Sequence, residues 1–368
     1  MSVPLVPAPI ARMPWGVLLL VTAITGFGLV VLYSAAGGNI RPWALSQGLR
    51  FAVFLVGACL LSRLDEKELR AAALPAYVIL VVLLFGVEAL GAVRGGSRRW
   101  LDLKVIRLQP SELMKPAIVL VLAWFYDMLP AAETRRWGAL WPGALLIGVP
   151  FLFVLVQPDL GTALMIAFGG VVVVFLAGVP LRIFGLAGAA VVVLTPIALH
   201  FMHDYQRSRI EIFLNPESDP LGTGYHIIQS KIAIGSGGVT GKGLLAGTQS
   251  HLDYLPEGHT DFVFATMAEE WGLVGGIGII AAYLLVIAWG MRVAGRARTR
   301  FGRLAAAGLA TTIFFYVAIN LLMVMGLAPV VGIPLPLVSF GGSAMMTVLI
   351  CLGLLMAIDR HADHPGRT

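Results

Sequence analysis

Residues 261–289 read DFVFATMAEEWGLVGGIGIIAAYLLVIAW, and the last nineteen of them contain no charged residue. A helix of about 20 apolar residues crosses a hydrocarbon core of about 30 Å, so this stretch predicts a membrane-spanning helix. The whole chain agrees, because 58% of its 368 residues are hydrophobic and only 12% are charged, against about 25% in soluble domains. The sequence is therefore that of an integral membrane protein.

Nine further apolar runs give ten predicted spans in an all-α, polytopic fold. The ten runs begin near residues 15, 45, 74, 111, 141, 161, 181, 262, 303 and 342. We expect one membrane domain over residues 1–368, with a large loop at about 201–260 between the seventh and eighth spans. The first run exceeds the roughly 7–15 residues of a signal-peptide core, so we interpret it as an anchor. Cys59 and Cys351 lie inside apolar runs, where packing explains them better than a disulfide.

Positive charges predict the orientation of the spans. With the N-terminus inside, the inner segments hold fourteen Lys and Arg residues, and the positive-inside rule then places both termini in the cytoplasm. One outer loop departs from the rule, because RGGSRRWLDLKVIRLQPSELMK at 94–115 carries six positive residues. Two explanations stay open: attraction to lipid phosphates, or a site for an anionic group such as a diphosphate. Trp100 in this loop could stack on a sugar or a prenyl chain.

The large loop contains GYHIIQSKIAIGSGGVTGKG at 224–243. Ile227, Ile228 and Ile232 fall on one face of a predicted short interfacial helix, with His226 and Lys231 on its polar side. The glycines that follow should end this helix. They could form a backbone nest for an anion, but they lack the P-loop pattern, and a flexible turn is the simpler interpretation.

Carboxylates gather where this loop enters the eighth span. Asp261 follows Glu257 and His259 in YLPEGHTD, and an acid at this position is often only a helix cap. Glu269 and Glu270 lie two to three turns further along. Because an unpaired charge in apolar surroundings is costly, we expect each of them to be neutral, paired or facing a polar cavity.

Other polar residues within the spans have structural explanations. Glu112 and Lys115 are spaced i, i+3 in SELMK and can neutralise each other as an ion pair. Asp159 in QPDLGTA is a candidate cap of the sixth span. The stretch 327–341 has too many prolines and glycines for a continuous helix, and contains no acid or base, so we interpret it as the wall of a cavity.

Together these motifs resemble the SEDS family (shape, elongation, division and sporulation proteins) from about residue 15 to residue 359. The motifs are RGGSRRWL, QPSELMK, QPDLGTA, IGSGGVTGKG, LPEGHTDFVFATMAEEWG and the stretch from Asn320 through MGLAPVVGIPLPLVSFGGSA. Phe340 departs from the family pattern, which has Tyr, Ser or Ala there. Short tails and ten spans are more similar to the RodA branch, which implies a role in cell elongation and rod shape.

The resemblance implies a peptidoglycan glycosyltransferase of the bacterial cytoplasmic membrane that polymerises lipid II on the outer face. It also implies a class B penicillin-binding protein as partner, in addition to lipid II and membrane lipids, and no nucleic acid. Asp261 matches the catalytic aspartate of the family, Trp100 its functionally important tryptophan, and Glu112 with Lys115 its ion pair.

The chemistry of glycan polymerisation fits these residues. A base must take the proton of the acceptor hydroxyl, and Asp261 is the candidate. Cations must stabilise the diphosphate leaving group, and one inverting displacement needs a single carboxylate. The candidates for substrate binding are Trp100, Arg94, Arg98, Arg99, Lys104 and Lys231, with Arg207 and Arg209 as further cations and Glu257 and His259 expected to shape the loop and tune Asp261. No metal-ligand spacing requires a cofactor, although Mg²⁺ or Mn²⁺ bridging the diphosphate is compatible with the sequence.

Two alternatives belong to other functional classes. A lipid II flippase would place essential charges near the middle of the membrane, which Glu269, Glu270 and Lys115 favour and Asp261 does not. A non-catalytic scaffold for penicillin-binding proteins would tolerate conservative changes at Asp261.

Overall fold

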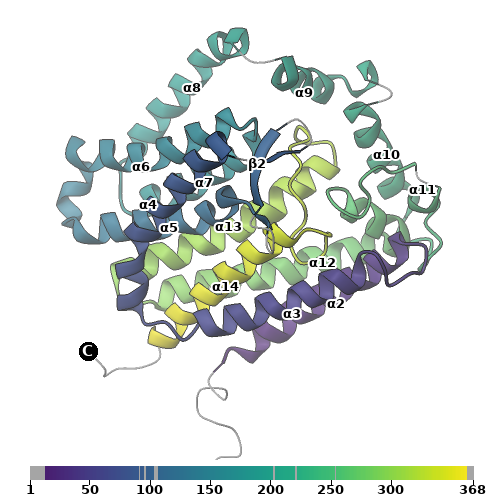
Figure 1. The fold of residues 1–368 in the computed structure, drawn as a ribbon, viewed down its shortest axis with the longest axis horizontal. Helices are drawn as coiled ribbons and strands as arrows, with labels where there is room; N and C mark the ends of the chain where they lie inside the picture. Colours follow the sequence, from purple (N-terminus) through teal and green to yellow (C-terminus); the bar gives the residue numbers. More distant parts are fainter. Residues whose placement is uncertain are drawn as a thin grey trace, which may run out of the picture.

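The computed structural model describes residues 13–90, 92–94, 97–102, 107–201, 204–219, 222–252 and 254–362. The described residues form a helical membrane bundle with one small sheet (Figure 1). The larger helices are α2 (Trp15–Ala35), α3 (Ala44–Leu61), α4 (Glu66–Leu90), α5 (Pro110–Met128), α6 (Trp137–Val156), α7 (Leu160–Leu176), α8 (Leu181–Phe201), α12 (Val263–Arg296), α13 (Arg300–Val324) and α14 (Gly342–Ala362).

These ten helices coincide with the ten predicted spans. Seven of them are long and apolar enough to cross a membrane, and α7 and part of α8 are shorter apolar helices. The remaining one, α5, contains Glu112, Lys115 and Asp127, which lower its hydropathy, yet most of its residues are buried. The protein is therefore a multi-pass membrane protein, as the apolar runs predict.

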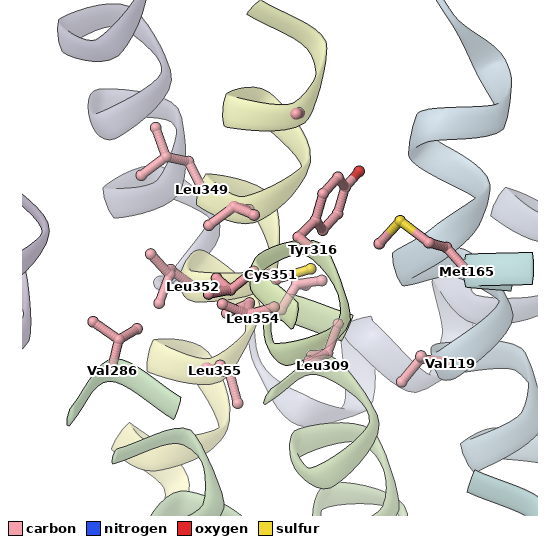
Figure 2. Close-up of a cluster of buried hydrophobic side chains, with 14 of the residues drawn as sticks. Val119, Met165, Val286, Leu309, Tyr316, Leu349, Cys351, Leu352, Leu354 and Leu355 are labelled. Carbon is pink, nitrogen blue, oxygen red and sulfur yellow. The ribbon is translucent and has the colours of Figure 1, made fainter. Parts of the chain in front are cut away.

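The centre of the bundle is α13, which packs against α5, α7, α12 and α14. Small residues on its surface allow this close packing. A Cβ built on Gly308 would lie 2.6 Å from a methyl carbon of Val119. Figure 2 shows one layer of this core, in which side chains of α13 lie between those of α14 and those of α5 and α7; the labelled residues include Leu309, Tyr316, Leu349, Leu352, Leu355, Val119 and Met165. Cys351 is buried there as a free thiol, and Cys59 is also free.

The helix α8 is peripheral. It extends away from the bundle in Figure 1, and Leu186 and Val192 are each 72% exposed. In a membrane-spanning helix, such exposed apolar side chains suit contact with lipid tails.

Different residues and segments lie at the two ends of the bundle. At one end, called the Asp65 end, Arg360 near the end of α14 donates to the Arg63 carbonyl at 2.6 Å, and His361 Nε2 lies 3.0 Å from Asp65 Oδ1. At the other end, called the Asp261 end, lie the described residues 92–94, 97–102 and 107–108, the helices that follow α8 in the large loop, and the segment between α13 and α14 (Figure 1).

The basic segment contains a sheet that the sequence did not predict. Its strands are β1 (Ala92–Arg94), β2 (Ser97–Asp102) and β3 (Arg107–Leu108), antiparallel in the order β1-β2-β3. Gly95 and Gly96 separate β1 from β2 in the sequence, and such a pair favours a two-residue hairpin link. The sequence did not predict these strands because they are short and rich in charged residues, and so show no alternation of apolar and polar side chains.

The large loop holds α9 (Asp204–Leu214), a 3-10 helix η2 (Pro216–Ser218), α10 (Thr223–Ser236) and α11 (Thr248–His251). A second 3-10 helix, η1 (Ala131–Arg135), lies at the Asp65 end. The helix predicted from the isoleucine spacing is α10, and it ends at Ser236, with Gly237 as its C-cap.

The helix α12 is broken at Gly272, whereas the sequence predicted one continuous span. The backbone there has φ +63° and ψ −161°, a conformation almost restricted to glycine. Peptide groups on both sides of the break bond to the glycine-rich segment: Leu273 N–H donates to Gly238 O at 3.0 Å, and Lys242 N–H donates to Glu269 O at 3.0 Å. The glycines therefore serve close backbone packing, because a Cβ on Gly241 would lie 2.1 Å from Glu270 O.

The segment 325–341 between α13 and α14 is non-helical, as predicted, and much of it is buried. Several of its backbone groups are hydrogen-bonded to side chains. Gln47 donates to Ser339 O at 2.7 Å, Tyr283 donates to Pro336 O, and Ser339 Oγ accepts from Leu335 N–H at 2.8 Å. Such bonding is what irregular backbone at membrane depth requires.

We predict that Gly272→Ala destabilises the protein by about 3 kcal/mol, because the new Cβ would combine a strained backbone with overpacking. That atom would lie 2.3 Å from Gly241 N. The control is Gly278→Ala in the same helix, where no atom lies within 4 Å. Thermal unfolding in detergent should separate the two variants, and equal melting temperatures would contradict the structural role of the break.

Candidate active site

Asp261 lies in the turn that leads into α12 and is half-buried. Its carbonyl oxygen accepts a hydrogen bond from Asn320 Nδ2 of α13 at 2.9 Å. Its carboxylate faces Gly332, where a Cβ would lie 3.4 Å from Oδ2 and the backbone φ is +71°. The N-cap of α12 is Phe262, one residue after Asp261, and its side chain makes no capping hydrogen bond. The capping explanation of Asp261 therefore stays a prediction. The carboxylate thus lies beside a residue that carries no side chain.

His259 is held in an aromatic stack. Its ring lies 4.0 Å from that of Trp43, with an interplanar angle of 9°, and 6.3 Å from that of Phe340. Its carbonyl accepts from Phe340 N–H at 2.9 Å. Burial lowers the pKa of His259, and the nearby Glu257 charge opposes this shift. These contacts connect the turn to α3 and to the segment before α14, so His259 positions the turn that carries Asp261.

Glu257 stabilises the same turn from the exposed side. Its backbone has φ +54°, its carbonyl accepts from the N–H groups of Thr260 and Phe262 at 3.0 and 3.2 Å, and its carboxylate accepts from Thr260 Oγ1 at 2.5 Å. In this structure Glu257 therefore contacts the backbone of the turn and shapes it.

The helix α10 packs against the start of α12 and the end of α13. Ser230 donates to Val324 O at 2.7 Å, and the His226 ring lies 5.8 Å from that of Phe262. Burial lowers the pKa of His226, against the charges of Glu257 and Asp219. Lys231 is exposed and lies over Gly326, where a Cβ would meet its Nζ at 2.9 Å. Lys231 and His226 therefore both contact segments that adjoin the turn carrying Asp261.

The basic segment is placed only in part. The backbone of Arg94 lies in β1 and that of Arg98 and Arg99 in β2, while Lys104 lies outside the described residues. Trp100 is partly exposed, and its Cα pairs with that of Ala92. The strand β2 packs on α4 and α5, so the sheet sits above the start of α5 at the Asp261 end.

Glu112 and Lys115 form the ion pair that their spacing predicts. Lys115 Nζ lies 2.6 Å from Glu112 Oε1 and 2.8 Å from the Tyr316 hydroxyl. Tyr316 donates to the other carboxylate oxygen, and Thr347 Oγ1 lies 3.2 Å from it. The pair is buried and joins α5, α13 and α14. Sequence reasoning missed Tyr316 and Thr347, because they are about 200 or more residues away in the chain.

Glu269 and Glu270 are paired with the loop. Glu269 contacts Lys242 Nζ at 2.7 Å, Thr248 Oγ1 at 3.1 Å and Gln249 N–H at 2.9 Å. Glu270 Oε1 accepts from Ser34 Oγ at 2.5 Å and lies 3.4 Å from His251 Nε2. These acids therefore fasten residues 242–251 to α12 and α2.

Asp159 caps α7 by accepting from Thr162 N–H at 3.1 Å, as predicted. Across the described parts of the chain, no three His, Cys, Asp or Glu side chains converge as metal ligands.

We predict that Glu269→Ala loosens the loop, because it removes the carboxylate that pairs with Lys242 and that accepts from the N–H groups of Gln249 and Ser250. The loss should be about 3 kcal/mol, as is usual when one partner of a buried pair is removed. Hydrogen exchange at residues 242–251 should rise.

The matched control is Glu133→Ala, which breaks the exposed pair with Arg136 at the Asp65 end and should cost less than about 1 kcal/mol. Unchanged exchange in the Glu269 variant would show that the loop is held by other contacts.

Comparisons with known proteins agree with this geometry. A family model described as a cell cycle protein, for FtsW, RodA and SpoVE, matches residues 14–364. The chain is 46% identical to the peptidoglycan glycosyltransferase MrdB of Escherichia coli over 94% of this chain and 92% of that protein. It is 36% identical to a probable peptidoglycan glycosyltransferase FtsW of Trichlorobacter lovleyi, over 96% and 94% of the two chains.

Two solved structures are also similar. One chain comes from a structure titled for the coordination of polymerization and crosslinking by a peptidoglycan synthase complex, with a TM-score of 0.82, 36% identity and coverage of 96% of this chain and 99% of that chain. The other is the rod shape determining protein RodA of Thermus thermophilus, with a TM-score of 0.73, 31% identity and the same coverages. The motifs, the fold and these matches together place the chain in the FtsW, RodA and SpoVE family, to which it belongs.

Proposed function

We propose that this protein is a peptidoglycan glycosyltransferase that joins lipid II units into glycan strands, with Asp261 as general base. The observation that carries this assignment is the placement of Asp261, whose peptide is held by Asn320 while its carboxylate borders the bare backbone at Gly332. Relatives that match nearly the whole chain are named peptidoglycan glycosyltransferases. The similarity to MrdB favours a role in cell elongation and rod shape.

The proposed chemistry uses one carboxylate. Asp261 accepts the proton of the acceptor sugar 4-hydroxyl as that oxygen attacks the anomeric carbon of the donor. The bond from this carbon to the diphosphate oxygen breaks, and undecaprenyl diphosphate leaves. A single displacement inverts the anomeric configuration, so no covalent enzyme intermediate is needed. Positioned bases of this kind contribute about 10²–10⁴-fold to rate.

The leaving diphosphate needs positive charge placed in advance. Lys231 is supported for this role by its exposure and its contact with Gly326. The arginines of β1 and β2 belong to the same end of the bundle, which fits the diphosphate explanation of the basic segment. A divalent cation bridging the diphosphate stays a prediction.

We further propose that the Asp261 end faces the outside of the cytoplasmic membrane and that both termini are cytoplasmic. The positive residues at the Asp65 end support this orientation. A class B penicillin-binding protein is the proposed partner, because a complex that couples polymerization to crosslinking is among the similar structures.

The flippase alternative rested on the buried charges of Glu269, Glu270 and Lys115, and the structure gives each of them a partner within the protein. Glu269 and Glu270 bind the loop 242–251, and Lys115 is enclosed by Glu112 and Tyr316. These contacts within the protein explain why the three charged side chains are buried. A transport path is therefore not needed to explain them.

We predict that Asp261→Asn lowers the polymerisation rate at least about 100-fold, because the amide cannot accept the proton. The measurement is glycan-chain formation from labelled lipid II by the purified protein with its penicillin-binding partner, whose transpeptidase is inhibited. Asp65→Asn, the same change at the opposite end, is the control and should keep the wild-type rate.

Polymer from a well-folded Asp261→Asn variant at the wild-type rate would remove Asp261 as base. No polymer from the wild type would instead favour the flippase or the scaffold.

We also predict that Arg98→Glu weakens lipid II binding by about tenfold or more, since it replaces attraction to the diphosphate by repulsion. Arg135→Glu makes the same charge reversal in η1 at the Asp65 end and should leave binding unchanged. The dependence of initial rate on lipid II concentration measures both variants. Equal affinities would leave attraction to lipid phosphates as the explanation of the basic segment.

A further inference from the structure

Asn320 of α13 joins two parts of the candidate site. Its side chain is fully buried. Its Nδ2 group donates to Asp261 O at 2.9 Å and to Ile333 O at 2.7 Å. Because both partners are carbonyl oxygens, which only accept, the NH₂ group must be the one facing them. One amide thus binds the carbonyl of Asp261 and the carbonyl of Ile333, the residue after Gly332.

We propose that Asn320 is a positioning residue for catalysis, which rests on the proposed role of Asp261 as base. One hydrogen bond fixes the backbone from which the Asp261 carboxylate projects. The other fixes the segment that carries Gly332, the wall beside Oδ2. The same buried amide therefore holds both the backbone of Asp261 and the segment that its carboxylate faces.

The helix beneath Asn320 is itself held firmly. Tyr316, one turn earlier in α13, binds both Lys115 and Glu112. This bonding ties α13 to α5 one turn below Asn320. The buried ion pair thereby helps to hold the part of α13 that carries Asn320.

The side-chain oxygen of Asn320, Oδ1, indicates that this residue does more than fill space. Its Oδ1 is buried and has no hydrogen-bond partner among the described residues. An unmet buried acceptor is unfavourable, and an apolar side chain of similar volume would avoid it. The amide is explained by its two donated hydrogen bonds, which no apolar side chain can supply.

The test compares Asn320→Leu with wild type in the lipid II polymerisation assay, using the full chain with its penicillin-binding partner. We expect kcat to fall about 10- to 100-fold, as for small displacements of catalytic groups. We expect KM to change less than about twofold, because the interaction acts on the reacting geometry. Tyr77→Phe is the control, since it also removes a hydrogen bond between two spans, from Tyr77 to Leu146 O at 2.9 Å, and it should keep the wild-type kcat.

Asn320→Asp supplies a readout that a purely structural role would not move. A neutral carboxyl can donate one O–H to one of the two carbonyls, whereas the ionised form donates none. The ratio of its kcat to that of wild type should therefore rise as pH falls, while the ratio for Asn320→Leu stays flat.

The possible outcomes separate the two proposals. If wild type polymerises and both Asn320 variants keep kcat, or lose activity only in proportion to folded protein measured by thermal unfolding, the positioning role is overturned. If Asp261→Asn polymerises like wild type, the proposed base is wrong and this inference fails with it. A fall in kcat in folded protein, together with the pH-dependent ratio, supports Asn320 as the positioning residue.

Discussion

The constraint on which this structure depends is that backbone polar groups within a membrane must be hydrogen-bonded inside the protein. The described chain leaves regular helix within the bundle at two places, the break at Gly272 and the segment 325–341. At Gly272 the glycine-rich segment after α10 supplies backbone partners on both sides of the break. At 325–341, side chains such as Gln47, Tyr283 and Asn320 supply them. Glycines and buried polar side chains are therefore placed by the same requirement.

The two irregular regions hold different carboxylates, because the break at Gly272 lies beside Glu269 and Glu270 whereas the segment 325–341 borders Asp261. Glu269 and Glu270 lie beside the break and fasten the loop, so their charges are used in holding structure. Asp261 lies in the turn before α12, with its peptide bound to α13. Its half-buried side chain can meet a substrate from the membrane surface while its backbone stays fixed. The four acids that the sequence shows as one group thus divide by role: Glu269 and Glu270 hold the loop, Glu257 shapes the turn, and Asp261 is the candidate base.

Local patterns predicted much of the fold and some of the site. Apolar runs located the ten spans, isoleucine spacing located α10, and i, i+3 spacing predicted the pairing of Glu112 with Lys115. The unpredicted features depend on contacts between distant parts of the chain: Lys115 meets Tyr316 across 201 positions, and Asn320 meets Asp261 across 59. No single segment contains that information, because packing of whole helices decides it. The break at Gly272 was missed for the same reason, since its cause is the docking of residues 237–243.

The arrangement also explains how a reactive group can be precise at the edge of a fluid membrane. A catalytic base must be held within a fraction of an ångström of its working position, yet the turn that carries Asp261 is exposed at Glu257 and close to the surface. The turn must therefore be held rigid by its contacts with the core of the bundle and with the neighbouring helices. Asn320 binds it from the core, the Trp43 ring supports it through His259, and α10 packs against the start of α12. The buried ion pair of Glu112 and Lys115, one turn below Asn320, extends this support into α5 and α14 through Tyr316 and Thr347.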